Sequence, residues 1–486
     1  MEGAELAAVA GGLGAACVVL AFERWLLLAG FVLLGAAEAG LVLSTSGGDG
    51  LSAALVALGA AGLVPLAIGA MLFLRWPHAI LPTILAAAPF RPPLEFDSAN
   101  RFYVGVAQEG ELGRLLPLYG VLGAATLALA WRALRGAPVP RLPRIVTIPG
   151  AAFFLLAGAS LTWSSDVDAG AKTLAFFLLP FAGLLAVGGR APVPRLRVLA
   201  VIAVALACVF AAFGLWQAAT HELFFFSPSV EVGNAFSSFF RVTSLFRDPS
   251  LYGRHVVLGL AVVLVLLLRR RLNPLLAAAL VVFLFAGLFF SYSQSSLVAL
   301  FAVVLALAAF VGDRRLRLVA AGTAAVVLLG GAGLVAASVE DHSARRVTSD
   351  RSRRIDLTVE VIRDHPLKGV GLGAQPVESQ RRSEQGGSPS RFVSHTTPLT
   401  VAAELGLIGL ALYIALLVGG ALLVDRVRRR HATLGLTLGA VLLALVVHSL
   451  AYSGFFEDPI TWVALAIGCA FLAAEPTGDA AILEEP

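Results

Sequence analysis

Apolar runs of about 18–25 residues recur from one end of this chain to the other, and each can cross a hydrocarbon core roughly 30 Å thick. Hydrophobic residues make up 58% of the 486 positions and charged residues 14%. A soluble domain is nearer 45–50% apolar and about 25% charged. The runs do not alternate apolar with polar positions, which excludes a membrane barrel. The sequence therefore predicts an all-α, polytopic transmembrane helical bundle of about 12–14 spans.

The candidate spans lie at about 5–22, 25–44, 51–74, 112–131, 145–163, 169–188, 197–219, 249–268, 273–292, 295–312, 316–338, 398–424, 433–453 and 459–474. The apolar stretch 78–90 is short for a span and contains Pro82, so we expect a re-entrant or interfacial segment. The count over the first 110 residues is open by one crossing. The first run has no basic region before it, which indicates a membrane helix and not a cleaved signal. We expect one integral-membrane domain at 1–474 and a disordered, acidic cytoplasmic tail at 475–486.

Short loops rich in arginine set the orientation, because such loops stay in the cytoplasm. They contain Arg132, Arg135, Arg141, Arg144, Arg190, Arg195, Arg197, Arg269–Arg271, Arg314, Arg315, Arg317, Arg426 and Arg428–Arg430. After residue 112 these loops alternate correctly with the spans, which places the long segment 339–397 on the extracytoplasmic side. That segment is itself rich in arginine, against the usual bias, and we expect its arginines to have a function.

The net charge of +5 comes mostly from arginines at helix ends and in loops, which suits anionic headgroups or phosphates. We expect no nucleic-acid partner. The three cysteines, Cys17, Cys208 and Cys469, lie in apolar runs without paired spacing, so we interpret them as packing residues. The spacing of a zinc site, a phosphate-binding loop or a serine-hydrolase elbow is absent from the sequence, and we expect no metal and no cofactor.

A first candidate site precedes the span at 249–268. Asp248 is a good N-cap and Pro249 a good first helical residue. Arg241 and Arg247 then lie just before a helix N-terminus, and Arg254 lies just inside it. Free N–H groups, the helix dipole and guanidinium groups together make an anion site. The alternative is that these arginines only reach lipid phosphates. The phenylalanines before this site predict an interfacial segment: Phe224–Phe226, Phe236, Phe239 and Phe240.

A second candidate site precedes the span at 398–424, where Thr397 can cap the helix and Pro398 can open it. His395 then lies just before the helix start and can act as a base near neutral pH, although a surface histidine without a role fits as well. Glu404 lies about two turns inside, where a carboxylate usually has a partner or a function. Arg351 and Arg354 share one face if their stretch is helical, and a solvated charged face is the alternative.

Asp166-Val167-Asp168 forms an outer-loop D-x-D pattern, which some glycosyltransferases use to hold a divalent cation beside a phosphate. A three-residue match is weak, and an N-cap for the span near residue 169 explains Asp168 equally well. We favour the cap. Glu457-Asp458-Pro459 is likewise typical of a cap before a span.

Three stretches together resemble the O-antigen ligase/polymerase family of bacterial membrane glycosyltransferases. The first, Arg241-x-x-Ser244-x-Phe246-x-Asp248-Pro249-Ser250, is similar to the family's R-x-x-G-x-F-x-N-P-N. The second has Arg351 ahead of Asp364-His365-Pro366-Leu367-Lys368-Gly369-Val370-Gly371, similar to an arginine ahead of D-x-P-L-x-G-x-G. The third has His395 followed by Glu404-Leu405-Gly406-Leu407-Ile408-Gly409, similar to H-N-x-x-L-x-x-x-x-E-x-G-x-x-G. The resemblance covers roughly 140–424 and includes the membrane plan.

The chain departs from the family pattern at several positions. Ser244 replaces a glycine, Asp248 and Ser250 replace asparagines, and Thr396 replaces the asparagine after the histidine. Gln294 stands where many members have an arginine after a Tyr-Ser pair. These departures bear on the subfamily, while the arginines and the histidine of the motifs are present.

The resemblance implies a metal-independent GT-C-type enzyme in the bacterial inner membrane, with its active site facing the periplasm and 339–397 as its catalytic loop. It would move a glycan from an undecaprenyl-diphosphate carrier to the hydroxyl of a glycolipid, glycan or protein acceptor. The family's functional residues match Arg241, Arg351 and His395. We expect the two arginines to stabilise the leaving diphosphate, supported by substrate-binding residues Arg247, Arg254 and Arg354.

We expect His395 to accept the proton of the acceptor hydroxyl, which predicts inversion in a single displacement. Glu404 either orients this histidine or holds the helix start, and we slightly prefer the structural role. Within the class, the residues leave open a polymerase, a lipid-A-core ligase, or a ligase to a protein or wall polymer. The rival from another class is a transporter or flippase of a lipid-linked anionic glycan, which would place ionisable residues near mid-membrane. Here the charges gather at one face, which favours surface chemistry.

Overall fold

The structure is a computed structural model that describes residues 3–45, 53–91, 115–225, 228–311, 314–315, 317–319, 322, 351–385, 394, 396–452 and 454–474. Within these ranges, the side chains of 53–61, 228–229, 351–353 and 384–385 are outside the description. The candidate residue His395 and most of the predicted span 316–338 also lie outside the described residues.

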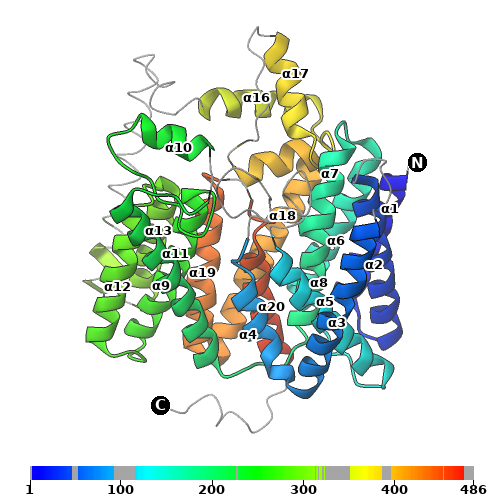
Figure 1. Cartoon of the computed structure of the whole chain (residues 1–486), viewed down its shortest axis with the longest axis horizontal. Coiled ribbons are helices and arrows are strands. Elements are labelled where there is room, and N and C mark those ends of the chain that lie inside the picture. The colour runs from blue at the N-terminus through cyan, green and yellow to red at the C-terminus, as the bar shows by residue number, and fades with distance from the viewer. Residues whose placement is uncertain are drawn as a thin grey trace.

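The elements are α1 (Gly3–Leu20), α2 (Arg24–Thr45), α3 (Ala53–Arg75), η1 (Pro77–Ala79), α4 (Ile80–Ala87), α5 (Leu116–Leu134), α6 (Arg144–Ser160), η2 (Leu161–Trp163), α7 (Val167–Thr173), η3 (Leu174–Leu178), α8 (Leu179–Gly188), α9 (Leu196–Thr220), α10 (Pro228–Ala235), α11 (Pro249–Leu268), α12 (Pro274–Phe289), α13 (Gln294–Val311), α16 (Arg351–Asp364), α17 (Gln375–Gln385), α18 (Thr397–Arg430), α19 (Ala432–Ser449) and α20 (Pro459–Ala473). The long apolar helices stand side by side, while α10, α16 and α17 lie at one end of the bundle (Figure 1).

The described residues form helices and no strands, which confirms the all-α, polytopic fold. Ten of the described helical segments are long and apolar enough to cross a membrane, or eleven if the bent pair formed by α3 and α4 is counted as one span. The apolar helices α12 and α20 have 16 and 15 residues and are shorter than the predicted spans. The remaining described spans begin and end within a few residues of their predicted positions.

The stretch predicted as re-entrant or interfacial forms a sharp bend followed by α4. The chain turns by 113° between Gly62–Arg75 and Pro77–Ala87. Pro77 opens the turn after the bend, where its missing N–H removes no helical hydrogen bond. Leu81 and Ile84 of α4 are fully buried, and the helix packs on α5, α8, α9 and α20. α4 is therefore an internal segment and does not lie on the surface of the bundle.

Helix starts follow the predicted caps at two positions and differ at two others. Asp248 and Asp458 accept hydrogen bonds from the first turns of α11 and α20, as predicted. The preference for Asp168 as a cap is wrong: Asp166 accepts from the N–H of Ala169, and Asp168 pairs with Lys172 at 3.0 Å. The predicted cap at Thr397 is also wrong, because that residue is already helical.

The Thr397 hydroxyl instead accepts a hydrogen bond from the N–H of Phe455 at 3.4 Å. Thr396 occupies the cap position of α18, without a side-chain capping bond. The predicted capping hydroxyl is thus used in a tertiary contact between the start of α18 and the loop before α20.

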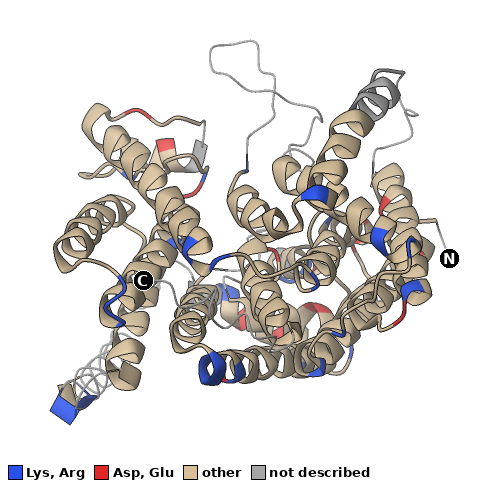
Figure 2. Cartoon of the chain, turned by 90° about the horizontal axis from the view of Figure 1, so that it is seen from below, with Lys and Arg blue, Asp and Glu red and all other residues tan. Residues whose placement is uncertain are grey.

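Arginine residues lie at the end of the bundle opposite α16 and α17, as the view from below shows (Figure 2). The loop after α5 and the C-terminal turn of α18 contribute to this face. This distribution fits the predicted sidedness, in which short basic loops lie in the cytoplasm. The sidedness itself stays a prediction.

Candidate active site

Arg241 is held in place through its backbone by a side chain from α10. Its N–H donates to Oδ1 of Asn234 at 2.9 Å, and its carbonyl accepts from Nδ2 of Asn234 at 3.0 Å. The Arg241 Nε donates to the carbonyl of Ser291 at 3.4 Å. The side chain is partly buried between the end of α10 and the turn after α12. This predicted site residue is thus fixed at a defined position before α11.

The buried side chain of Gln217, near the end of α9, holds the backbone of Thr243 and Ser244, shortly after Arg241. Its Oε1 accepts from the N–H groups of Thr243 and Ser244 at 3.0 and 2.6 Å, and its Nε2 donates to the Ser244 carbonyl at 3.0 Å. Sequence reasoning missed this residue, although a single glutamine inside an apolar span is a usable signal because a buried amide needs partners.

The backbone at Ser244 explains why the similar family motif has a glycine there. Its φ is +53°, in the left-handed region that favours glycine. The Ser244 hydroxyl donates to the carbonyl of Phe210 at 2.7 Å and is fully buried. The serine therefore adopts the conformation of the family's glycine and gains a hydrogen bond to α9.

Arg254 does not lie at an open surface, where the sequence interpretation placed it. Its side chain is 4% exposed and pairs with the fully buried Asp458 at 2.7 Å. Burial by itself raises the pKa of Asp458. The nearby Arg254 and then His255 lower the pKa by more than burial raises it, so it lies below its usual value. The ion pair joins the second turn of α11 to the N-cap of α20. Arg247, by contrast, stays partly exposed just before α11.

Further polar side chains are buried beside this ion pair. His448, at the end of α19, is close to Ser295 of α13, with 3.2 Å between Nε2 and Oγ. Ser293 contacts Ser296 with 2.9 Å between their hydroxyl oxygens. His448 was overlooked in the sequence, although it lies in an apolar run. These contacts join the outer ends of α13 and α19 next to α11.

The second and third sequence motifs contact each other through backbone hydrogen bonds. The N–H of Gly371 donates to the Glu404 carbonyl at 2.8 Å, and the N–H of Val370 donates to the Ala403 carbonyl at 3.0 Å. Leu407 donates its N–H to the Pro366 carbonyl at 2.8 Å. These partners are available because α18 is interrupted within the third motif.

That interruption is at Gly406, which has φ +67° and ψ −169° inside α18. A Cβ there would lie 2.2 Å from the Leu367 carbonyl oxygen, and one at Gly369 would lie 2.3 Å from the Glu404 carbonyl oxygen. Gly369 also has a positive φ, of +66°. Both glycines of the motifs are thus required by close backbone approach and by conformation. The Glu404 carboxylate is directed at the backbone N–H groups of Gly373 and Gln375, at the start of α17.

The outer loop before α7 packs on the same segment. The Ser164 hydroxyl donates to the Leu372 carbonyl at 3.0 Å, and the N–H of Ser165 donates to the Val370 carbonyl at 3.3 Å. The indole N–H of Trp163 donates to the Lys368 carbonyl at 3.3 Å. The region around the D-x-D pattern is therefore scaffold for the second motif. Within the described ranges, no three His, Cys, Asp or Glu side chains group closely enough to hold a metal ion.

Gln375 connects α16 and α17 with the residue before His395. Its Nε2 donates to Oγ1 of Thr358 on α16 at 3.2 Å, and its Oε1 accepts from the N–H of Ser394 at 3.1 Å. Arg351 is the first residue of α16, and its side chain is outside the description. Arg354 is partly buried one turn later. Thus α16 and Ser394 share one buried amide, which sequence reasoning did not single out.

The loop between α19 and α20 brings the two predicted helix starts together. Phe455 in this loop contacts Thr397 at the start of α18, and Asp458 pairs with Arg254 of α11. The N-terminal ends of α11, α18 and α20 therefore converge at the end of the bundle where α10, α16 and α17 lie (Figure 1). Each of the three helices has a proline in its first turn. Their dipoles present partial positive charge to the same region.

Residues 279–414 match the family model described as O-antigen ligase. This part of the chain is similar to the O-antigen ligase family. No curated protein matches the chain. The matched range includes the second and third motifs, whereas Arg241 and Gln217 lie before it. The O-antigen ligase match and the apolar helices indicate a multi-pass membrane protein that transfers glycans as a ligase or polymerase. A lipid-linked glycan and an acceptor are its general partners.

Proposed function

We propose that this protein is an inverting, metal-independent membrane glycosyltransferase. It transfers a glycan from undecaprenyl diphosphate to an acceptor hydroxyl, as an O-antigen ligase or a surface-polysaccharide polymerase. The observation that carries the proposal is the O-antigen ligase match, within which the second and third motifs are joined by backbone hydrogen bonds. The site faces the periplasm from the inner membrane.

Arg241 and Arg351 stabilise the charge that builds on the diphosphate as the bond to the sugar breaks. Guanidinium groups bind phosphate oxygens through paired, charge-assisted hydrogen bonds. Preorganised donors of this kind lower the barrier because they need no rearrangement during the reaction. The converging N-termini of α11, α18 and α20 add partial positive charge, and Arg247 and Arg354 extend the site toward the donor.

Arg254 has a different role in this proposal. Its charge is engaged by Asp458, so it positions the start of α11, and with it Arg247 and Arg241. An arginine committed to a buried carboxylate binds a second anion poorly, since the carboxylate already cancels its charge.

His395 accepts the proton of the acceptor hydroxyl as its oxygen attacks the anomeric carbon. The two described residues beside it are held in place: Ser394 binds Gln375, and Ser394 and Thr396 contact each other through their hydroxyl oxygens at 3.2 Å. Glu404 has a structural role in this proposal, but at the start of α17 and the second motif and not at the start of its own helix. A direct displacement by the activated hydroxyl inverts the anomeric centre.

A flippase for a lipid-linked anionic glycan is the second candidate. The buried Arg254–Asp458 pair and the sharply bent α3–α4 segment are features that transporters also use. The concentration of charge at one end of the bundle favours the transferase.

The test is glycan transfer in reconstituted membranes, with a polyprenyl-diphosphate-linked oligosaccharide as donor and EDTA present. Wild type is compared with His395→Ala, Arg241→Ala and, as a matched control from a basic loop at the other end, Arg269→Ala. We expect the control to keep wild-type activity and both site variants to bind donor without turnover.

Products of many sizes identify a polymerase, and a single transfer identifies a ligase. Wild-type turnover by both site variants would contradict the assigned residues. Movement of intact donor between leaflets without transfer would favour the flippase.

A further inference from the structure

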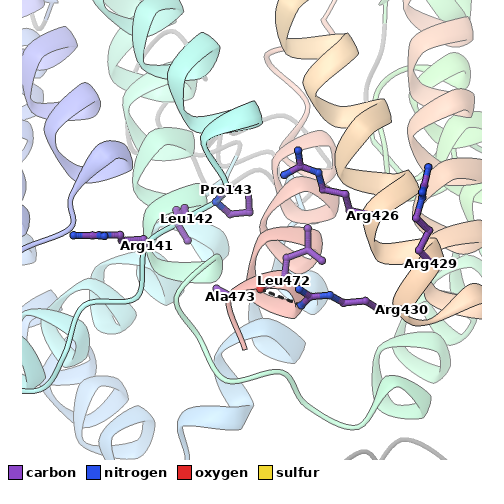
Figure 3. A pocket seen from close by; sticks show the side chains of 8 residues that line it. All are labelled: Arg141, Leu142, Pro143, Arg426, Arg429, Arg430, Leu472 and Ala473. Carbon is purple, nitrogen blue, oxygen red and sulfur yellow. Dashed lines mark hydrogen bonds between the residues drawn. The ribbon is translucent and has the colours of Figure 1, made fainter. Parts of the chain in front are cut away.

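A basic cavity lies at the end of the bundle opposite the candidate active site. Its volume is about 420 Å³, and it lies between the end of α18, the end of α20 and the loop before α6 (Figure 3). The lining residues are Arg141, Leu142, Pro143, Arg426, Arg429, Arg430, Leu472 and Ala473. Arginine is the only polar residue type in this lining, and no acid lines the cavity.

The arginines differ in how far neighbours already engage them. Arg429 pairs through Nε with Asp425 at 2.8 Å, and Arg430 donates to the Leu472 carbonyl at 3.4 Å. Arg141 is turned away from the others and lies over the ring of Phe22, 5.5 Å from its centre. Arg426 has no ion pair with any described acid and points toward Pro143 (Figure 3). The cavity thus keeps guanidinium N–H donors for a ligand.

The start of α6 gives a second, independent reason to expect an anion. Pro143 is its N-cap and supplies no side-chain capping bond. The N–H of Val146 donates to the Pro143 carbonyl at 3.1 Å, but the N–H groups of Arg144 and Ile145 have no capping side chain. These two N–H groups lie beside the cavity, where the helix dipole is positive. A phosphate oxygen is a suitable acceptor for such groups.

We propose that this cavity binds the phosphate of an anionic glycerophospholipid headgroup. Arg426 and Arg430 contact the phosphate with the start of α6, and Arg141 and Arg429 lie at the rim. Leu142, Pro143, Leu472 and Ala473 provide the apolar surface for the glycerol and the first acyl carbons. Inorganic phosphate shares the recognised chemistry, but it would leave this apolar surface uncovered. Basic pockets between membrane helices on the cytoplasmic side bind such headgroups.

The site is independent of the proposed transferase activity, because it lies at the far end of α18 from Thr397. A lipid bound there stabilises the junction of α6, α18 and α20. The arginines also complement the negative C-terminal ends of α18 and α20 without any ligand, which is the competing explanation to be tested.

The experiment uses the full chain in a neutral detergent and measures thermal unfolding during titration with cardiolipin, phosphatidylglycerol, phosphatidylcholine or sodium phosphate. The test variant is Arg426→Gln with Arg430→Gln. The matched control is Arg269→Gln with Arg271→Gln, which removes the same charge from exposed arginines outside the cavity. If the double variant does not fold, the single variant Arg426→Gln is used, because Arg426 is exposed and pairs with no acid in the described part of the chain.

We expect cardiolipin and phosphatidylglycerol to raise the unfolding temperature of wild type and of the control. The half-saturating lipid concentration rises about tenfold or more in the test variant, since the variant loses charge-assisted hydrogen bonds to the phosphate. Equal weakening in both double variants would show diffuse attraction and overturn the site. Stabilisation by sodium phosphate alone, dependent on Arg426, would overturn the lipid assignment. Absence of any stabilisation would support the dipole explanation against ours.

Discussion

The backbone N–H of Gly371 donates a hydrogen bond to the carbonyl oxygen of Glu404 at 2.8 Å, and this bond joins two motifs that are separate in the sequence. It forms because α18 breaks at Gly406 and exposes carbonyl groups that a regular helix would satisfy internally. The segment that follows α16 therefore packs directly on the helix that follows His395. The arrangement makes the site depend on backbone geometry as much as on charged side chains.

Gly406→Ala is expected to destabilise the protein. The left-handed backbone costs roughly 1–3 kcal/mol for a residue with a Cβ, and the added Cβ would lie 2.2 Å from the Leu367 carbonyl oxygen. Gly35→Ala is the control, since a Cβ at that helical position meets no atom within 4 Å. The midpoint temperature of thermal unfolding in detergent should fall only for Gly406→Ala. Equal midpoints would contradict the role assigned to the break.

Arg254→Ala is expected to lower the free energy of unfolding by about 3–5 kcal/mol, because it leaves the buried Asp458 without its charge partner. Removing both charges together, as Arg254→Ala with Asp458→Asn, is expected to lower the stability by less than the sum of the two single variants. Denaturant unfolding of the four proteins in this cycle gives the coupling energy. A coupling near zero would show that the pair does not join α11 to α20.

The pH dependence of unfolding follows from the lowered pKa of Asp458, whose carboxylate is favoured in the folded protein. A carboxyl with a lowered folded pKa contributes its stability above the unfolded value of about 3.9 and loses it as the pH falls through the folded pKa. The stability difference between wild type and Asp458→Asn should therefore stay constant from about pH 8 to about pH 5 and shrink below about pH 4. A stability difference that shrinks near neutral pH would contradict a lowered pKa of Asp458.

Gln217→Leu is expected to lower the free energy of unfolding by about 2–4 kcal/mol, since it leaves two N–H groups and one carbonyl at Thr243 and Ser244 buried without partners. Glycan transfer should also fall, because these residues lie two and three positions after Arg241. Thr220→Val on the same helix is the control, as its exposed hydroxyl bonds only within α9. Unfolding and transfer assays on both variants check the prediction. Full transfer activity in Gln217→Leu would mean that the hydrogen bonds of Gln217 do not position Arg241.

Gln375→Leu is expected to lower the turnover number at least tenfold while donor binding is kept. The change removes the bond that the amide donates to Thr358 and the bond that it accepts from Ser394, and it releases the residue before His395. A catalytic group misplaced by about 1 Å can cost roughly a hundredfold in rate. Arg381→Gln, at an exposed position on α17, is the control. Turnover number and KM are measured separately, and a change confined to KM would contradict a positioning role.

The sequence by itself determined the helices and their approximate ends. Apolar runs of membrane length require internal hydrogen bonding, so spans such as 249–268 could be predicted nearly to the residue. Asp248 and Asp458 were recognisable as caps because capping depends on residues a few positions apart. The motifs that resemble the O-antigen ligase family lie partly in the range that its family model matches.

Only the tertiary structure decided which partners the polar groups take. Arg254 seemed available for substrate from its place in the sequence, yet it pairs with Asp458, more than two hundred residues later. Asp166 caps α7 in place of Asp168, and Thr397 contacts Phe455, because the local pattern allowed neighbouring residues either role. Gln217 and Gln375 gained their importance from backbone groups brought to them by folding. A polar group selects its partner by distance in space, which periodicity and spacing along the chain do not specify.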